Sequence, residues 1–119
     1  GHDAGDAVLR SLGKLLQENL RGEDTACRYG GEEFLLLLPY ASLEAAHRRA
    51  QELLEKSRKL RVRAEETMLS ITLSSGVAAL PDHGDEMFSI IKAADDALYT
   101  AKEHGRNRVV AANVQHESQ

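Results

Sequence analysis

The sequence predicts an α+β fold in which helices pack on a mainly antiparallel sheet. Three segments carry apolar residues at helical spacing. Two strand-like runs flank a Gly-Gly dipeptide, which predicts a β-hairpin. Farther along, apolar and polar residues alternate, as in a half-buried strand. The expected order is α-β-β-α-β-α-β, and this segregation of hairpin and helices favours a sandwich of helices on a sheet.

The first helix and the hairpin follow from the pattern of residues 3–39. We expect a helix from about Asp3 to Leu20, because apolar residues recur there at helical spacing, and Gly22 is its terminator. A short strand is expected from Thr25 to Arg28. The run from Phe34 to Leu38 is continuously apolar, which predicts a strand buried on both faces. The intervening Tyr-Gly-Gly-Glu would form the turn of the hairpin.

The second half of the chain predicts two more helices and two more strands. Ser42 is a good N-cap for a second helix, and Asp85 for a third that Gly105 ends. From Thr67 the apolar residues alternate, so we expect one half-buried strand there, bent or bulged at Gly76. Val109 to Ala112 is the expected last strand.

Composition narrows the possible classes of protein. The 119 residues are 42% hydrophobic, so we expect one domain over residues 1–112 and a flexible tail over residues 113–119. The 15 basic residues against 19 acidic ones argue against broad nucleic-acid binding. A single cysteine allows no internal disulfide, and with no signal-like or membrane-spanning run a cytoplasmic location is expected.

The stretch CRYGGEEFLLLLP carries the first candidate site. Gly30 and Gly31 allow positive φ and let a ligand approach the backbone, since no Cβ is in the way. Beside them, Glu32 and Glu33 could hold Mg²⁺, which is commonly bound by one or two carboxylates together with substrate phosphates. A plain Gly-Gly turn with solvated glutamates explains the same residues. Both interpretations stay open on these residues alone.

Three further groups of polar residues have the same two interpretations. Lys102 and Arg106 suit a polyphosphate if the helix places them on one side, yet basic residues also complement the dipole of a helix C-terminus. Arg21 could bind phosphate or a base and Asp24 a guanine edge, or the two could form a loop ion pair. Asp6 could accept hydrogen bonds from a purine or simply stabilise a first helical turn.

Four ordered motifs resemble one family. RYGGEEF resembles the signature of the GGDEF domain, the diguanylate cyclases; GHDAGDAVL, SITLSSGVA and ADDALYTAKEHGRNRV resemble three other segments of that family, and together they cover Gly1 to about Val110. The resemblance implies a ferredoxin-like nucleotidyl-cyclase palm. It also implies an enzyme that condenses two GTP molecules into cyclic di-GMP and pyrophosphate, with Mg²⁺ or Mn²⁺ as cofactor.

The resemblance implies a role for each candidate residue. Glu32 would be the metal ligand, and Glu33 belongs to the same essential signature. Gly30 and Gly31 would let the nucleotide lie against the hairpin. Asp6, with Leu9 nearby, would bind guanine. Lys102 and Arg106 would bind the terminal phosphates. Arg21 and Asp24 would form the Arg-x-x-Asp site of product inhibition.

The resemblance also implies partners and one departure. GTP, cyclic di-GMP, a second copy for catalysis and an upstream regulatory or sensory domain are expected, and the parent could be membrane-anchored through an upstream region. The family's first strand, with a metal-binding Asp, and its F-K-x-x-N-D segment are not seen. We therefore expect a C-terminal portion that is itself inactive, and that self-associates, exchanges elements with a neighbour or re-pairs Phe34–Leu38 with Leu69–Leu73. The alternative function is a catalytically silent sensor of cyclic di-GMP or GTP.

Overall fold

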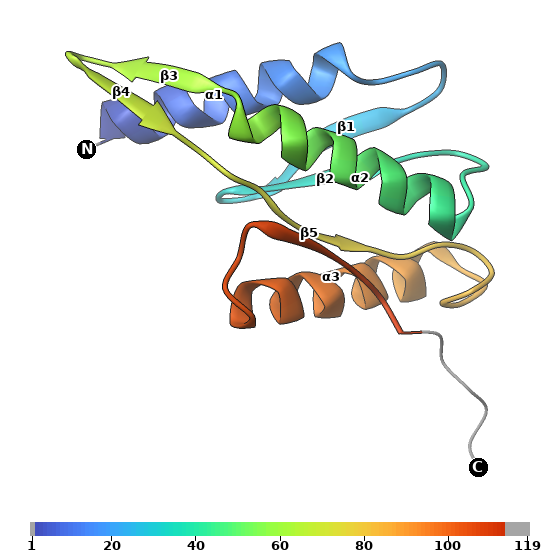
Figure 1. The fold of residues 1–119 in the computed structure, drawn as a ribbon. Helices are drawn as coiled ribbons and strands as arrows, with labels where there is room; N and C mark the ends of the chain where they lie inside the picture. The colour runs from blue at the N-terminus through green and yellow to red at the C-terminus, as the bar shows by residue number, and fades with distance from the viewer. Residues whose placement is uncertain (1, 114–119) are drawn as a thin grey trace. The chain divides into compact units, whose positions relative to one another are not determined.

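The computed structural model describes residues 2–113, which form three helices and six strands (Figure 1). In chain order they are α1 (His2–Glu18), β1 (Thr25–Gly30), β2 (Glu33–Leu37), α2 (Leu43–Arg58), β3 (Arg61–Ala64), β4 (Thr67–Ser70), β5 (Ser74–Val77), α3 (Met87–Glu103) and β6 (Arg108–Ala111). The α+β class, the three helices and the first hairpin are therefore confirmed. The expected tail falls almost wholly on residues 114–119, which lie outside the described residues.

The described strands differ from the expectation in two ways: they form three separate sheets, and there are six of them where four were expected. The described strands form three two-stranded sheets, of which β1–β2 and β3–β4 are antiparallel and β5–β6 is parallel. The single strand expected after Thr67 is wrong, because β4 ends at Ser70 and β5 begins at Ser74. Sequence reasoning missed β3, whose basic residues are exposed and whose only buried side chain is Val62. One buried position in four leaves little alternation to detect.

Two finer expectations are also wrong, and one of three expected alternatives is not seen. Within the described residues Phe34–Leu38 does not re-pair with Leu69–Leu73, since β2 pairs with β1, and β4 pairs with β3, whereas self-association and exchange of elements with a neighbour stay predictions. All five residues of β2 are half-buried rather than fully buried. The N-cap of α3 is Glu86, which makes no side-chain capping hydrogen bond, so Asp85 does not cap the helix.

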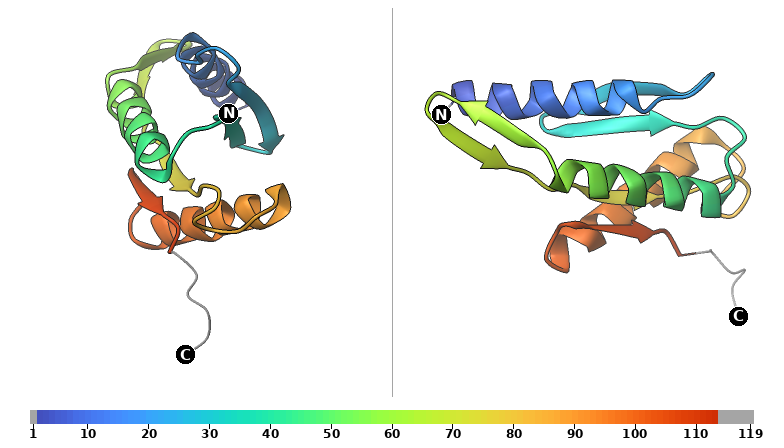
Figure 2. Two further views of the ribbon diagram at one scale, coloured as in Figure 1. Left: turned by 90° about the vertical axis from the view of Figure 1, so that its right-hand side faces the viewer. Right: turned by 45° about the horizontal axis from the view of Figure 1, so that its top comes forward.

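The chain divides into two compact units, which are described separately. The first contains residues 2–40 and 55–71. In it, β3 packs along α1, and both views of Figure 2 show the yellow-green β3–β4 hairpin beside the blue helix. Leu12, Leu15, Leu16 and Val62 are its buried apolar residues. The end of α2 is joined to the end of α1 by a hydrogen bond from Lys56 Nζ to Asn19 Oδ1.

The second unit contains residues 41–54 and 72–113. In it, α3 packs on β5 and β6. The buried apolar residues of these elements and of the following loop include Val77, Ala79, Ala97 and Ala101. Gly76 allows the close approach: a Cβ there would lie 2.0 Å from the backbone oxygen of Ala94 and 2.4 Å from the backbone nitrogen of Leu98. The bulge expected at Gly76 is absent, because β5 and β6 pair in continuous register.

Buried His83 fastens the loop between β5 and α3. The backbone N–H of Ala79 donates to His83 Nδ1 over 3.0 Å, so the proton of the neutral ring is on Nε2. That Nε2–H donates to the carbonyl oxygen of Ala112 over 2.8 Å. One side chain therefore links the end of β5 to the residue that follows β6.

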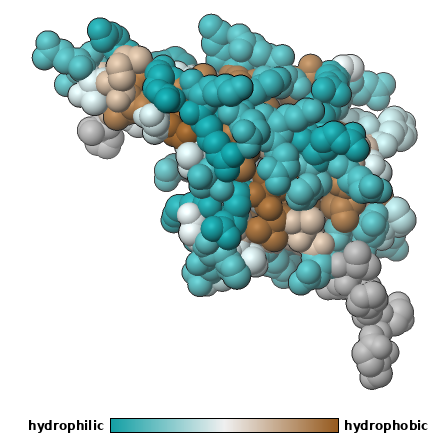
Figure 3. Space-filling view, in the orientation of Figure 1, coloured by the Kyte–Doolittle hydropathy of each residue, from teal (hydrophilic) through white to brown (hydrophobic). Residues whose placement is uncertain are grey.

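The outer surface in the view of Figure 3 is mostly hydrophilic, in keeping with a chain that is 29% charged. Within residues 2–113, no helix has both the length and the apolar character needed to cross a bilayer.

Candidate functional site

The β1–β2 turn exposes Gly30 and Gly31. Gly30 pairs with Glu33 across the hairpin, so Gly31 and Glu32 form the turn itself. Gly31 has φ +37°, a left-handed conformation that favours glycine. No atom lies within 4 Å of the place where a Cβ would stand on either glycine. The backbone is therefore open at both glycines, and the approach of a ligand there stays a prediction.

The two glutamates of this turn lie in different environments. Glu32 is exposed, and no hydrogen bond or ion pair of its side chain is found within the described part of the chain. Glu33 begins β2 and is half-buried. Among residues 2–113 no three His, Cys, Asp or Glu side chains gather into a metal-binding group. One or two carboxylates of this kind still fit Mg²⁺, whose remaining ligands are commonly phosphates and waters.

Arg28 reaches from β1 to the turn. Its Nε and Nη2 atoms both donate to the carbonyl oxygen of Gly31, over 2.9 and 2.6 Å. The strand pairing shifts register between Arg28 and Gly30, which leaves Tyr29 as a bulge. Sequence reasoning assigned Arg28 no role at the hairpin. Its position three residues before Gly31, across a Gly-Gly turn, is the only signal that it would touch that turn.

A hollow of about 280 Å³ joins the hairpin to α1. Asp6, Leu9 and Arg10 of α1 line it together with Arg28 and Phe34 of the hairpin. The structure thus places Asp6 and Leu9, two of the predicted binding residues, beside the hairpin strands. Arg10 was missed, although its distance of four residues from Asp6 places both on one face of a helix. The hollow combines one carboxylate and two guanidinium groups with the apolar side chains of Leu9 and Phe34, which suits a polar planar ligand.

Arg21 and Asp24 form a tight turn between α1 and β1. The backbone N–H of Arg21 donates to Asp24 Oδ2 over 2.9 Å, and the backbone N–H of Asp24 donates to the Arg21 carbonyl over 2.8 Å. The Asp24 carboxylate therefore holds the backbone of the turn. The Arg21 residue is exposed.

Lys102 and Arg106 lie in the second unit, at the end of α3. Helical spacing would align them only if the helix continued to Arg106, and it does not, because α3 ends at Glu103 and Arg106 has φ +61°. The backbone N–H of Arg106 donates to the Ala101 carbonyl over 2.9 Å, which closes the helix with a left-handed loop. Lys102 is half-buried and Arg106 is exposed. Glycine at position 105, with φ +109°, allows the chain to turn at this point.

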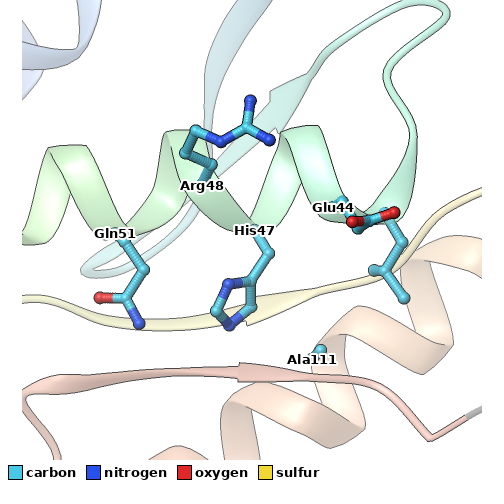
Figure 4. Close-up of a pocket in the computed structure, with 6 residues that line it drawn as sticks. Glu44, His47, Arg48, Gln51 and Ala111 are labelled. Atoms are coloured by element: carbon cyan, nitrogen blue, oxygen red, sulfur yellow. The ribbon is translucent and has the colours of Figure 1, made fainter.

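A second hollow, of about 510 Å³, lies along α2 in the second unit. Its lining residues are Leu43, Glu44, His47, Arg48, Gln51 and Ala111. In Figure 4, His47 and Gln51 point toward the side where Ala111 lies, whereas Arg48 points to the opposite side. None of the predicted site residues lines this hollow.

Comparison with known proteins identifies a family and several relatives. The family described as "Diguanylate cyclase, GGDEF domain" matches residues 1–108. Diguanylate cyclase VdcA of Vibrio cholerae is 43% identical over 113 residues, which are 92% of this chain and 33% of that protein. The chain spans about a quarter to a third of the length of the curated relatives it matches.

Solved structures agree with the sequence match. The GGDEF domain of YfiN (TpbB) from Pseudomonas aeruginosa superposes with a TM-score of 0.86 at 33% identity, covering 97% of this chain and 72% of that one. The GGDEF domain of DgcB from Caulobacter crescentus, solved in complex with c-di-GMP, gives a TM-score of 0.82 at 33% identity, covering 93% and 66%.

Proposed function

This chain belongs to the diguanylate cyclase GGDEF family, and on that premise we propose that it is the catalytic part of a diguanylate cyclase. The proposed reaction condenses two GTP molecules into cyclic di-GMP and pyrophosphate. The observation that carries the proposal is the open Gly30–Gly31 turn, which presents the exposed Glu32. Arg28 and Phe34, close to this turn in the sequence, line the hollow together with Asp6.

The metal has candidate ligands at this turn. Glu32, with Glu33 of the same signature, would hold Mg²⁺ or Mn²⁺, and the ion would supply positive charge to the phosphate oxygens. The open backbone at Gly30 and Gly31 lets a triphosphate approach without meeting a side chain. The carboxylates would thus hold the cation beside the hairpin, where the triphosphate would approach.

Two groups of residues are candidates for contacts to GTP, and each is described within its own unit. In the first, Asp6 would accept hydrogen bonds from the guanine edge, and Leu9 would supply apolar contact within the same hollow. In the second, Lys102 and Arg106 would bind the terminal phosphates, since ammonium and guanidinium groups suit a polyphosphate.

The proposed chemistry requires two copies of the domain. The 3′-hydroxyl oxygen of one GTP forms a bond to the α-phosphorus of the other, the bond from that phosphorus to the pyrophosphate breaks, and the hydroxyl proton is lost. A second attack of the same kind, by the 3′-hydroxyl of the second GTP on the α-phosphorus of the first, closes the ring and releases a second pyrophosphate. Since each domain holds one GTP, a homodimer is the proposed active form, and the remainder of the protein is the proposed place for regulatory or sensory domains. Positioning and charge neutralisation account for most of the rate in phosphoryl transfer.

Replacing Glu32 by glutamine in the whole protein tests the proposal. The substitution keeps the size of the side chain and removes one anionic ligand, so cyclic di-GMP formation from GTP and Mg²⁺ should fall by about 10²–10³-fold. Glu66→Gln, at an exposed glutamate outside the site, is the matched control and should keep its activity. A Glu32→Gln protein that works within a few-fold of the parent would contradict the assignment. We expect the 119-residue chain alone to form no product.

The Arg21–Asp24 turn supports a second proposal, product inhibition. With the backbone of the turn held by Asp24, the exposed Arg21 could bind a phosphate of cyclic di-GMP. Arg21→Ala should weaken cyclic di-GMP binding in a calorimetric titration and relieve inhibition, while initial turnover stays largely unchanged. Unchanged affinity would leave this segment as an ordinary loop.

The alternative proposal is a silent module that senses cyclic di-GMP or GTP. The same turn at Arg21 favours it, because that turn requires no chemistry at Glu32. The two functions separate in one assay. A whole protein that binds cyclic di-GMP or GTP but forms no product under the conditions above is a sensor, and one that forms product is a cyclase.

A further inference from the structure

We propose that Arg28 is a positioning residue, which locks the β1–β2 turn so that Glu32 is presented in one conformation. The kinetic effects of this inference rest on the proposed function. The rigidity of the turn does not, because it follows from the hydrogen bonds of the hairpin alone.

The contact is a two-pronged, charge-assisted one. Both Nε and Nη2 of Arg28 donate to the same acceptor, the Gly31 carbonyl, over 2.9 and 2.6 Å. A carbonyl oxygen has two lone pairs, so the fork uses its full accepting capacity. Hydrogen bonds from a charged donor are shorter and stronger than neutral ones. The guanidinium group therefore fixes the orientation of the peptide plane that leads into Glu32.

The turn has few other restraints. Gly31 has no side chain, and no atom stands within 4 Å of the position that its Cβ would occupy. Glycine also carries the largest conformational freedom of any residue. Within the described residues, the fork of Arg28 is the side-chain contact to this peptide that the structure shows. Without the fork, Gly31 and Glu32 would sample several backbone conformations.

The bulge explains why residue 28 can do this. Arg28 pairs with Phe34 and Gly30 with Glu33, so Tyr29 is the extra residue on β1. A bulge bends its strand and increases the local twist. The bend brings the side chain of the residue before the bulge over the turn that follows. Lysine at this position would keep the charge but not the planar fork.

The alternative role for Arg28 is a direct contact to the nucleotide, because the residue also lines the hollow with Asp6. The two roles predict different results. If Arg28 contacts the nucleotide, its loss should mainly weaken the binding of GTP. If Arg28 positions the turn, its loss should weaken metal binding and lower turnover, and the turn should be mobile before any ligand is added.

Arg28→Lys in the whole protein distinguishes these roles. Outer partners of metal ligands typically contribute about 10–100-fold, so we expect the Mg²⁺ concentration for half-maximal rate to rise by that factor while the KM for GTP changes less than about threefold. Arg63→Lys, an exposed arginine of β3, is the matched control and should change neither quantity. A rise in the KM for GTP with unchanged Mg²⁺ dependence would overturn the proposal in favour of direct nucleotide contact.

A second readout does not depend on catalysis. With ¹⁵N-glycine labelling and no nucleotide or metal, the Gly31 amide should have an order parameter near the rigid value of about 0.85 in the parent and below about 0.6 in Arg28→Lys. A parent value already below about 0.6, or an unchanged value in the variant, overturns the proposal. If the parent forms no cyclic di-GMP, the proposed function fails, yet this measurement still decides whether Arg28 holds the turn.

Discussion

The β1–β2 turn and strand β5 both depend on glycine, for opposite reasons. At Gly30 and Gly31 there is nothing within 4 Å of a potential Cβ. At Gly76 such a Cβ would lie 2.0 and 2.4 Å from backbone atoms of α3. The turn has glycine because its backbone must stay open and adopt positive φ, whereas β5 has glycine because a helix backbone already occupies the space.

The comparison separates residues that we propose to serve a ligand from residues that serve the fold. The turn carries exposed charge and exposed backbone, which stabilise little and can bind a partner. The β5–α3 contact is made by glycine and small residues, which let the backbones approach closely. A substitution should therefore damage binding at the first region and stability at the second, and each prediction below tests that division.

The largest expected effect on stability is that of Gly76→Ala. Overpacking usually costs about 1–3 kcal/mol. Here the obstructing atoms are backbone atoms of Ala94 and Leu98, which cannot rotate away, so we expect a cost at or above the upper end of that range. Urea unfolding should show the midpoint falling, together with loss of α3 packing.

The matched control is Gly5→Ala in α1, where nothing lies within 4 Å of the new methyl group. Alanine is the better helix former by about 0.5–1 kcal/mol, so this protein should be as stable as the parent or more so. If Gly76→Ala and Gly5→Ala unfolded at the same urea concentration, the close approach of α3 to β5 would be wrong.

A smaller loss is expected from His83→Leu, in the same unit. Leucine fills much of the same buried space but leaves the Ala79 N–H without its acceptor and the Ala112 carbonyl without its donor. An unsatisfied buried group costs about 1–3 kcal/mol. His104→Leu, at an exposed histidine, is the control for the same chemical change. Equal thermal stability of the two variants would show that the His83 hydrogen bonds contribute nothing to folding.

The elements that the sequence predicted well are those with a strong local signal. The three helices have wide apolar stripes, and the first hairpin has its Gly-Gly turn, so class and order were largely predictable. The β3–β4 hairpin was not, because Val62 is the one buried residue of β3 and the turn between the strands, which includes Glu65 at φ +56°, has no glycine. The approach of α3 to Gly76 was also hidden, since a glycine in a strand equally indicates a bulge.

The site shows the same limit. The GGEEF turn and Asp6 could be named from the sequence, because residue type and spacing carry their chemistry. The places of Arg28 at the turn and of Arg10 in the hollow could not, since they depend on the bulge at Tyr29 and on α1 lying beside the hairpin. The spacing of Lys102 and Arg106 would align them only on a continuing helix, and the positive φ of Gly105 and Arg106 instead places Arg106 in a loop.

The smallest expected change in stability is that of Gly31→Ala, and it tests the other half of the comparison. The left-handed φ of +37° should cost alanine about 1–2 kcal/mol, whereas Gly30→Ala, at a position without positive φ, should cost less. Asparagine tolerates the left-handed region, so Gly31→Asn should recover most of the stability. If the turn needs glycine only for its conformation, Gly31→Asn will also restore cyclic di-GMP formation. We expect instead that stability returns and activity does not, because the added side chain would stand where we propose that the phosphates approach. Unfolding and product formation measured on the same three variants decide between the two, and full activity in Gly31→Asn would show that no ligand lies against this backbone.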